Sequence, residues 1–524
     1  MKAILFSAAL ALATAHQAVA APTLDQVRID SGPLRGATGG DVVSFKGVPF
    51  AAPPVGDLRW RAPQPAPPWT GVRAATAYGH DCMQKPFPSD AAPLGTEPAE
   101  DCLVLNVWRP AKASKARLPV MVWIYGGGFV NGGSSPAVYD GSQFAKRGVV
   151  LVSFNYRVGR FGFFAHPALT AETPNGPLGN YGFMDQIAAL KWVQRNIAAF
   201  GGDPDNVTVF GESAGGFSIH TLLTTPLATG LFAKAIIESG GGRGNISPGR
   251  QVHDQPAGAP PSGESVGLAF AKSVGVEGQD AAALAALRAL SADKVTAGLN
   301  MMSMFANPTY VGPMIDGQIV LGEPAALYPA GKAADVPVMI GATGMDGFSM
   351  ARTLDQVYAP LGVERRAAAQ GAYDPSASGD VRAVGAKVAS DQMMVEPARF
   401  VAQTLAGQGR KVFEFRFSYV AQSMRKEWPG APHASDIPFV FDTVKARYGD
   451  ALTAQDEQVA QLANAYWVAF AKTGDPNGGG RPRWPAYSVA DDQIMDLAAP
   501  AKGEPDPLKA RLDFMQTVNG GGAK

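Results

Sequence analysis

Buried strands and helices alternate through the middle of the chain. Continuous apolar runs rich in valine and isoleucine predict strands that are covered on both faces. These runs lie within residues 118–133, 148–159, 206–210, 232–240 and 336–343. Apolar positions at helical spacing between and after them predict helices, the clearest of which cover residues 182–202 and 456–474. This alternation is typical of an α/β fold, with a large and mostly parallel sheet between layers of helices.

Two further segments, around residues 250–335 and 350–410, depart from this alternation and are mainly helical in composition. We expect both to be helical insertions in a single domain over residues 21–524, the second forming a lid over the sheet. An alternating run at residues 410–420 predicts the last major strand, and the tail after residue 474 is expected to be irregular.

The pattern G-x-S-x-G occupies residues 211–215, directly after the strand at 206–210 and before an apolar stretch that predicts a helix. A sharp strand-to-helix turn would lift the hydroxyl of Ser213 clear of the sheet, and it would favour glycine at both flanking positions. A glycine-rich loop with an idle serine is the alternative. The flanking strand and helix favour a nucleophile.

A serine hydroxyl needs an adjacent base, and His433 is the candidate that remains by elimination. In this arrangement an acid and then a histidine follow the serine along the chain. The segment 1–20 would be removed with one histidine, two others precede Ser213, one is about 10 Å away on the same helix, and one leaves no room for an acid-bearing strand. These five are His16, His80, His166, His220 and His253.

Asp346 is the favoured acid, because it follows the strand at 336–343 and lies between Ser213 and His433 in the chain. Asp316 is the rival, and both precede a glycine, as turn aspartates often do. The glycine run at 126–128 follows another buried strand, where backbone N–H groups could bind an oxyanion. Gly127, Gly128 and Ala214 are the predicted donors, although a flexible turn would also use glycine.

The charge balance excludes no fold but removes one class of partner. The chain has 45 basic and 45 acidic residues, so its net charge gives no reason to expect nucleic acid or an anionic membrane surface. The predicted chemistry needs no metal and no cofactor. The substrate is expected to be a small molecule, and the sequence leaves the oligomeric state open.

The first twenty residues predict an export signal. Lys2 precedes an apolar core, and Ala18-Val19-Ala20 forms a small-x-small cleavage site, so we expect cleavage after Ala20 and a periplasmic or secreted protein. A retained anchor is the alternative. No later run of about 18 apolar residues is present, so we expect no stable insertion into a membrane.

The chain has two cysteines, Cys82 and Cys102. Export to an oxidising compartment and an even count favour one disulfide, with two buried thiols as the alternative. Two cysteines beside a single histidine leave a zinc site short of ligands.

Seven ordered motifs resemble those of the type-B carboxylesterase family of α/β-hydrolases, which includes the cholinesterases. They are EDCLVLNVW, WIYGGGF, NYRVGRFGF, the long run GNYGFMDQIAALKWVQRNIAAFGGDPDNVTVFGESAGG, GATGMDGF, HASDIPFVF and WPAY. The resemblance implies an α/β-hydrolase fold and ester hydrolysis through a serine acyl-enzyme. It implies Ser213, Asp346 and His433 as the triad, with Gly127, Gly128 and Ala214 as oxyanion donors. It also implies a Cys82–Cys102 disulfide that closes a loop beside the substrate gorge.

Three positions depart from the family pattern. The family usually has glutamate where this chain has Asp346, so the reach to His433 is one methylene shorter. Residues 83–101 contain no tryptophan, which makes choline esters an unexpected substrate. Glu238 stands where a glutamine is common. Phe129, Phe305 and Phe439 are candidates for the gorge wall or for the core.

The sequence therefore predicts an exported serine carboxylesterase. A non-catalytic binding or adhesion protein on the same fold is one alternative. An acyl transferase or amidase with the same triad is another. The natural ester is not specified by any of these patterns.

Overall fold

The fold is seen in a computed structural model, which describes residues 24–87, 90–112, 114–245, 248–255 and 258–520. The predicted signal peptide at residues 1–20 lies outside these ranges. None of the helices in the described part of the chain is both long and apolar enough to cross a membrane.

The core is a mixed sheet of eleven strands in the order β14-β13-β12-β11-β10-β9-β7-β8-β6-β4-β3. Strands β7 to β13 pair in parallel at its centre, and antiparallel strands extend both edges. The predicted α/β architecture is thus confirmed. The strands are β3 (Ala37–Gly39), β4 (Val42–Pro49), β6 (Val104–Pro110), β7 (Leu118–Ile124), β8 (Val150–Phe154), β9 (Gly202–Glu212), β10 (Lys234–Glu238), β11 (Val338–Thr343), β12 (Val412–Phe417), β13 (Gln493–Asp496) and β14 (Lys502–Pro505).

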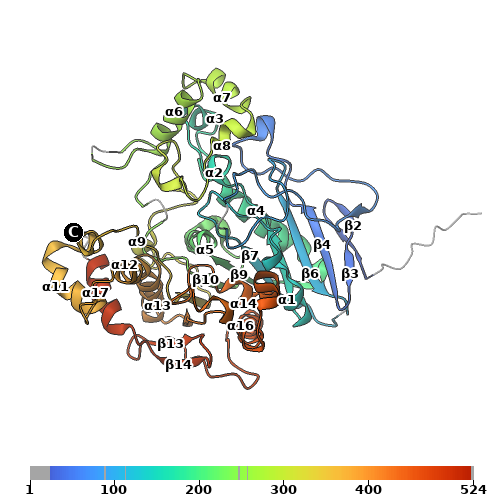
Figure 1. Ribbon diagram of the computed structural model, residues 1–524. Coiled ribbons are helices and arrows are strands. Elements are labelled where there is room, and N and C mark those ends of the chain that lie inside the picture. The colour runs from blue at the N-terminus through green and yellow to red at the C-terminus, as the bar shows by residue number, and fades with distance from the viewer. Residues whose placement is uncertain (1–23, 88–89, 113, 246–247, 256–257, 521–524) are drawn as a thin grey trace, which may run out of the picture.

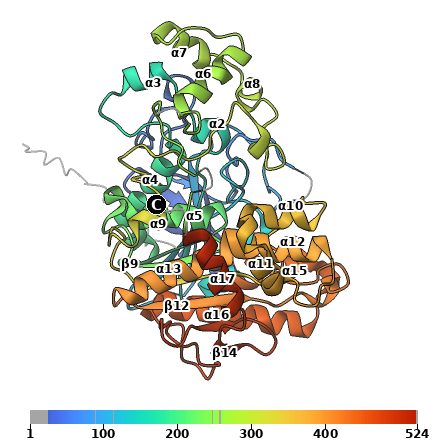
Figure 2. The ribbon, with the colours of Figure 1, turned by 90° about the vertical axis from the view of Figure 1, so that its left-hand side faces the viewer.

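Helices cover both faces of this sheet (Figure 1). Figure 2 shows α5 and α13 on one side of the strands and α16 on the other. The strands between them are buried along their whole central length, as the continuous apolar runs predict. The covering helices are α1 (Ser142–Lys146), α4 (Tyr181–Asn196), α5 (Ala214–Thr224), α13 (Glu396–Gly407) and α16 (Ala454–Thr473).

Helix α16 agrees closely with its predicted range of 456–474. Thr453 and Asp456 form a reciprocal capping box at its start, and Gly474 ends it with a φ of 71°. Its apolar side packs on the sheet through residues such as Trp467, which is fully buried.

Both segments that depart from the alternation contain helices, although residues 298–323 of the first are mostly loop. The first forms a projecting lobe at the top of Figure 1, and the second lies beside the carboxyl ends of β11 and β12. The lobe contains α6 (Gly263–Ser273), α7 (Ala281–Arg288) and α8 (Ala292–Thr296). The second segment contains α10 (Leu354–Tyr358), α11 (Arg366–Tyr373), α12 (Val381–Ser390) and a π-helical turn at Asp391–Val395.

The tail is more regular than predicted. Strands β13 and β14 extend the sheet beyond β12, and helix α17 (Lys509–Gly520) packs beside α11 and α13. The expectation of an irregular tail was wrong, because strands of four residues are too short to show a clear periodicity. The ion pair between Arg416 on β12 and Asp506, at 2.7 Å, helps hold this tail against the sheet.

Cys82 and Cys102 form a disulfide, as predicted. The amino-terminal part of the chain also forms a small sheet of three strands. That sheet consists of β1 (Gln26–Ile29), β2 (Gly32–Arg35) and β5 (Arg73–Ala74).

The turn from β9 into α5 is the tightest packing point near the middle of the sheet. Gly211 pairs with Ile124 on β7 and with Ile237 on β10. A Cβ on Gly215 would lie 1.9 Å from the backbone oxygen of Ile124, and one on Gly211 would lie 2.6 Å from the same oxygen. Both flanking positions of the motif therefore require glycine for space, as the motif predicts.

We expect Gly215→Ala to destabilise the fold by at least about 2 kcal/mol, since its methyl group would collide with backbone that cannot move freely. Gly371→Ala is the matched control, because Gly371 lies on the exposed face of α11 with nothing within 4 Å of its added Cβ. Chemical denaturation of both variants measures the difference. Equal unfolding midpoints would contradict the packing argument.

Candidate active site

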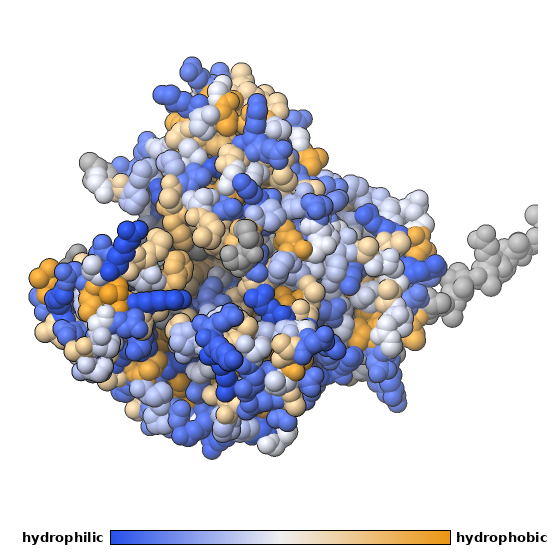
Figure 3. Space-filling view, viewed as in Figure 1, coloured by the Kyte–Doolittle hydropathy of each residue, from blue (hydrophilic) through white to orange (hydrophobic). Residues whose placement is uncertain are grey.

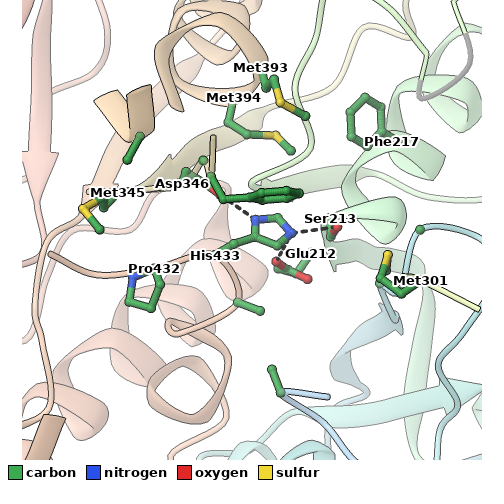
Figure 4. A pocket seen from close by; sticks show the side chains of 18 of the residues that line it. Glu212, Ser213, Phe217, Met301, Met345, Asp346, Met393, Met394, Pro432 and His433 are labelled. Carbon is green, nitrogen blue, oxygen red and sulfur yellow. Dashed lines mark hydrogen bonds and ion pairs between the residues drawn. The ribbon is translucent and has the colours of Figure 1, made fainter. Parts of the chain in front are cut away.

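Three side chains from separate parts of the chain meet at the carboxyl ends of neighbouring strands. Ser213 lies at the turn after β9, Asp346 lies in the loop after β11, and His433 lies in the loop after β12. Nε2 of His433 is 2.8 Å from Oγ of Ser213, and Nδ1 is 2.5 Å from Oδ1 of Asp346 (Figure 4). The serine, histidine and acid predicted from the sequence are therefore in hydrogen-bonding contact.

Asp346 is held by groups on three different elements. Its Oδ2 accepts hydrogen bonds from the N–H of Thr343 at 2.9 Å and from the hydroxyl of Ser239 at 2.5 Å. Its own N–H donates to Oγ of Ser390 at 2.9 Å. The shorter side chain of aspartate thus reaches the imidazole without a gap, because the loop around it is fixed from several sides.

The rival acid and the other buried histidine on α5 serve local structure. Asp316 accepts hydrogen bonds from the backbone N–H groups of residues 318–320 and from Asn180. His220 bonds to the hydroxyl of Tyr328 at 2.7 Å. Neither has an interaction with Ser213 or His433.

The backbone at Ser213 itself is unusual for a residue with a side chain. Its φ of 55° and ψ of −121° mark a strained conformation, which positions the hydroxyl at the point of the turn. Ala214 begins helix α5 directly behind it, where the first N–H groups of a helix have no partner within the helix.

The predicted glycine run lies directly opposite this turn. Gly127 and Gly128 have positive φ values of 98° and 60° and line the same cavity as Ser213. A Cβ on Gly126 would lie 3.0 Å from Cβ of Ser213, so the loop passes as close as a backbone can. This loop and the start of α5 both lie beside Ser213.

A cavity of about 770 Å³ opens over the serine. Its wall includes Phe305, one of the three predicted gorge residues, whereas Phe129 and Phe439 are fully buried in the core. The disulfide loop contributes part of the wall, as the resemblance implies. The aromatic residues that line the cavity are Phe87, Tyr139, Phe217, Phe305, Phe348 and Trp428.

Asn131, which is buried, joins three parts of this wall. Its Nδ2 donates to Oε1 of Gln84 in the disulfide loop at 3.1 Å, and its Oδ1 accepts from the N–H of Met301 at 2.8 Å. Its own N–H donates to the carbonyl oxygen of Gly127 at 2.9 Å. One residue, through its side chain and its backbone N–H, therefore ties the glycine run to the disulfide loop and to the segment of Met301.

A family model described as "Carboxylesterase family" matches residues 23–369 and 363–515. The chain belongs to the carboxylesterase family. It is a carboxylic ester hydrolase with the α/β-hydrolase fold, as the motifs of the sequence imply.

Individual relatives agree with this family. The chain is 36% identical over 480 residues to a fumonisin B1 esterase from Sphingopyxis macrogoltabida, covering 87% of this chain and 83% of that enzyme. It is 35% identical to a para-nitrobenzyl esterase from Bacillus subtilis (strain 168), covering 92% and 97%. A solved PNB esterase structure matches with a TM-score of 0.77 and 33% identity, covering 94% of this chain and 100% of that one.

Two buried carboxyl groups beside the histidine were missed in the sequence. Oε1 of Glu212 lies 3.2 Å from Nε2 of His433, and burial raises the pKa of Glu212 to about 8. Burial and the neighbouring charge of Asp346 raise the pKa of Asp436 to about 7. Their positions were the available signal, since Glu212 is the first variable position of the serine motif and Asp436 lies three residues after His433 in the chain.

Glu238 belongs to the interior of this carboxylesterase and not to the cavity wall. Its Oε1 accepts a hydrogen bond from Nε1 of Trp467 at 2.7 Å. Burial raises its pKa well above the ordinary value, because a charged carboxylate is disfavoured in the apolar interior.

The carboxyl groups of Glu212 and Asp346 also determine the pKa of His433. Burial alone would lower the pKa of His433, but the charges of Glu212 and Asp346 outweigh burial and raise it to about 10. An imidazole can accept a proton only when it is neutral, and a raised pKa keeps it protonated to higher pH. Activity that needs this base is therefore gained as the pH rises.

We expect kcat/KM for a short ester to be still rising between about pH 7 and 9, above the ordinary range of a free histidine. In Glu212→Gln, which removes one of the charges that favour imidazolium, the inflection should move to lower pH. Glu238→Gln is the control, because that buried carboxyl bonds to Trp467 and not to the histidine. An unmoved inflection in Glu212→Gln would contradict the electrostatic argument.

Proposed function

We propose that this chain is an exported serine esterase that hydrolyses small-molecule esters through an acyl-enzyme on Ser213. The observation that carries the proposal is the unbroken chain of hydrogen bonds from Ser213 through His433 to Asp346, at the floor of a cavity. The esterase names of its relatives support the same reaction class.

In the proposed reaction, Oγ of Ser213 attacks the ester carbonyl carbon while Nε2 of His433 takes the hydroxyl proton. Asp346 holds the imidazole in the required orientation and stabilises the imidazolium that forms. The tetrahedral oxyanion then collapses, the bond to the alcohol breaks, and His433 gives its proton to the leaving oxygen. Water repeats the same steps on the acyl-enzyme and releases the acid.

Gly127, Gly128 and Ala214 are the proposed donors to the oxyanion. The close approach of the glycine run to Ser213 supports this assignment, and so does the start of α5 directly behind the serine. Fixed N–H groups of this kind are effective because they need no reorientation as the charge develops. No metal or cofactor takes part in the proposed steps.

We expect Ser213→Ala to lose nearly all hydrolysis of nitrophenyl acetate, a fall of at least about a thousandfold. An organophosphate should add one covalent phosphoryl group to the native protein, measured by intact mass, and none to the variant. Ser423→Ala, which changes an exposed serine that does not line the cavity, is the control. Activity or labelling that persists in Ser213→Ala would overturn the assignment.

The alternatives from the sequence separate in the same assay. Labelling with turnover speaks against a binding protein without catalysis. An acyl transferase or amidase would instead pass the acyl group to an added alcohol or amine, or cleave an amide, which product analysis detects.

Export is supported by the predicted signal at residues 1–20 and by the disulfide, which persists in oxidising compartments. We expect the protein expressed from its full sequence in a bacterium to be recovered outside the cytoplasm. Its amino-terminal residue, read by sequencing, should be Ala21. An intact amino terminus in the cytoplasmic fraction would contradict the prediction.

A further inference from the structure

Exposed apolar side chains gather at the mouth of the cavity. Of the eleven large hydrophobic residues that are exposed in the described ranges, five belong to three segments that border the opening. We name these five the apolar collar: Met302, Phe305, Phe348, Met350 and Met393. Phe305, Phe348 and Met393 line the cavity itself, and the other two adjoin lining residues in the chain.

The side chains of the collar are largely exposed to solvent. Met393 is 48% exposed and the other four are between 70% and 87% exposed. Single apolar residues on a surface are normal, whereas a contiguous group that borders a pocket marks a binding surface. Figure 3 shows a hollow in this face of the molecule with light orange side chains around it.

The first collar segment, residues 300–306, packs directly on the glycine run. Met301 donates its N–H to Asn131, as described above. A Cβ on Gly128 would lie 2.8 Å from Sδ of Met304 and 2.9 Å from Cε of Met301. The segment that carries Met302 and Phe305 therefore borders the place where the reacting carbonyl would lie.

The second segment, residues 345–350, and the third, the π-helical turn at Asp391–Val395, are fixed to each other. A Cβ on Gly347 would lie 2.3 Å from the backbone nitrogen of Ser390, immediately before the π-helical turn that carries Met393. Asp391 anchors that turn from behind, because it pairs with Arg511 of α17 at 2.5 Å and accepts from the hydroxyl of Tyr373 at 2.9 Å. These anchors hold the collar in place before any ligand arrives.

The composition of the wall indicates what would bind. Seven of the sixteen methionines lie in these three segments: Met301, Met302, Met304, Met345, Met350, Met393 and Met394. Methionine side chains are flexible and adapt to ligands of variable shape. A cavity of about 770 Å³ also exceeds what an acetate ester of a small alcohol fills.

We propose that the apolar collar binds the far end of a flexible alkyl chain, on an ester whose carbonyl lies at Ser213. This inference rests on the proposed function and names the substrate class: esters with a chain long enough to pass from the serine to the mouth. Each methylene that leaves water against the collar contributes to binding of the transition state.

The test compares kcat/KM for nitrophenyl acetate and octanoate, both below the concentration at which octanoate aggregates. A second arm compares ethyl acetate with octyl acetate in a pH-stat, so that an acyl chain and an alcohol chain are distinguished. The test variant is Phe305→Ser with Phe348→Ser. Its matched control is Val363→Ser with Val489→Ser, two exposed apolar residues that are absent from the cavity wall.

We expect the collar variant to lose about tenfold in kcat/KM for the long ester of one arm, either nitrophenyl octanoate or octyl acetate. Its kcat/KM for the short ester of that arm, nitrophenyl acetate or ethyl acetate, should change little. The control should retain both rates. Equal loss on short and long esters, or no loss on the long ester in either arm, overturns the proposal and leaves the function of Ser213 intact.

A third result identifies a different occupant. If the native enzyme gains rate only when octanoate aggregates, and the collar variant loses only that gain, then the collar docks on an aggregate surface and the proposal fails. Hydrolysis of nitrophenyl acetate by Ser213→Ala would instead refute the proposed function, so the two failures remain distinguishable.

Discussion

The site depends on how closely three backbone segments approach one another around Ser213. The carbonyl oxygen of Ile124 occupies the space that a side chain on Gly215 would need, and Gly126 lies against Ser213 on the other side. The serine can hold its strained backbone only because both neighbouring strands and the helix behind it are packed at this distance. Sheet packing and the position of the hydroxyl are thus one constraint.

The buried carboxyl groups add an electrostatic layer to this geometry. The carboxyl groups of Glu212, Asp346 and Asp436 surround a single imidazole, and the imidazole itself faces the open cavity. Such a cluster stabilises the positive charge on His433, which the proposed reaction requires after each proton transfer. It also makes the resting histidine harder to deprotonate, so the same groups assist one half of the cycle and oppose the other.

Much of the fold and the position of the serine could be predicted because their causes are local in the sequence, whereas His433 was found by elimination and Asp346 by its place after a strand. Buried parallel strands leave long apolar runs, and the turn at Ser213 requires glycine at fixed positions. Glu212 and Asp436 escaped notice because their effect depends on burial beside His433, which no spacing reveals. The roles of Phe87 and Phe348 in the cavity wall were missed for a different reason, because a loop has no hydrophobic periodicity from which its contacts could be predicted. The strands of the tail were not predicted because each has only four residues, too few to show an alternating pattern.

Asn131 shows how the reacting groups and the outer wall are related. Its side-chain amide bonds to the disulfide loop and to the N–H of Met301, and its backbone N–H bonds to the glycine run. The side chains that face the opening take no part in them. Substitutions at the cavity mouth can therefore change the substrate range and leave the reacting groups around Ser213 unchanged. An engineer could replace the side chains at the mouth without altering the triad.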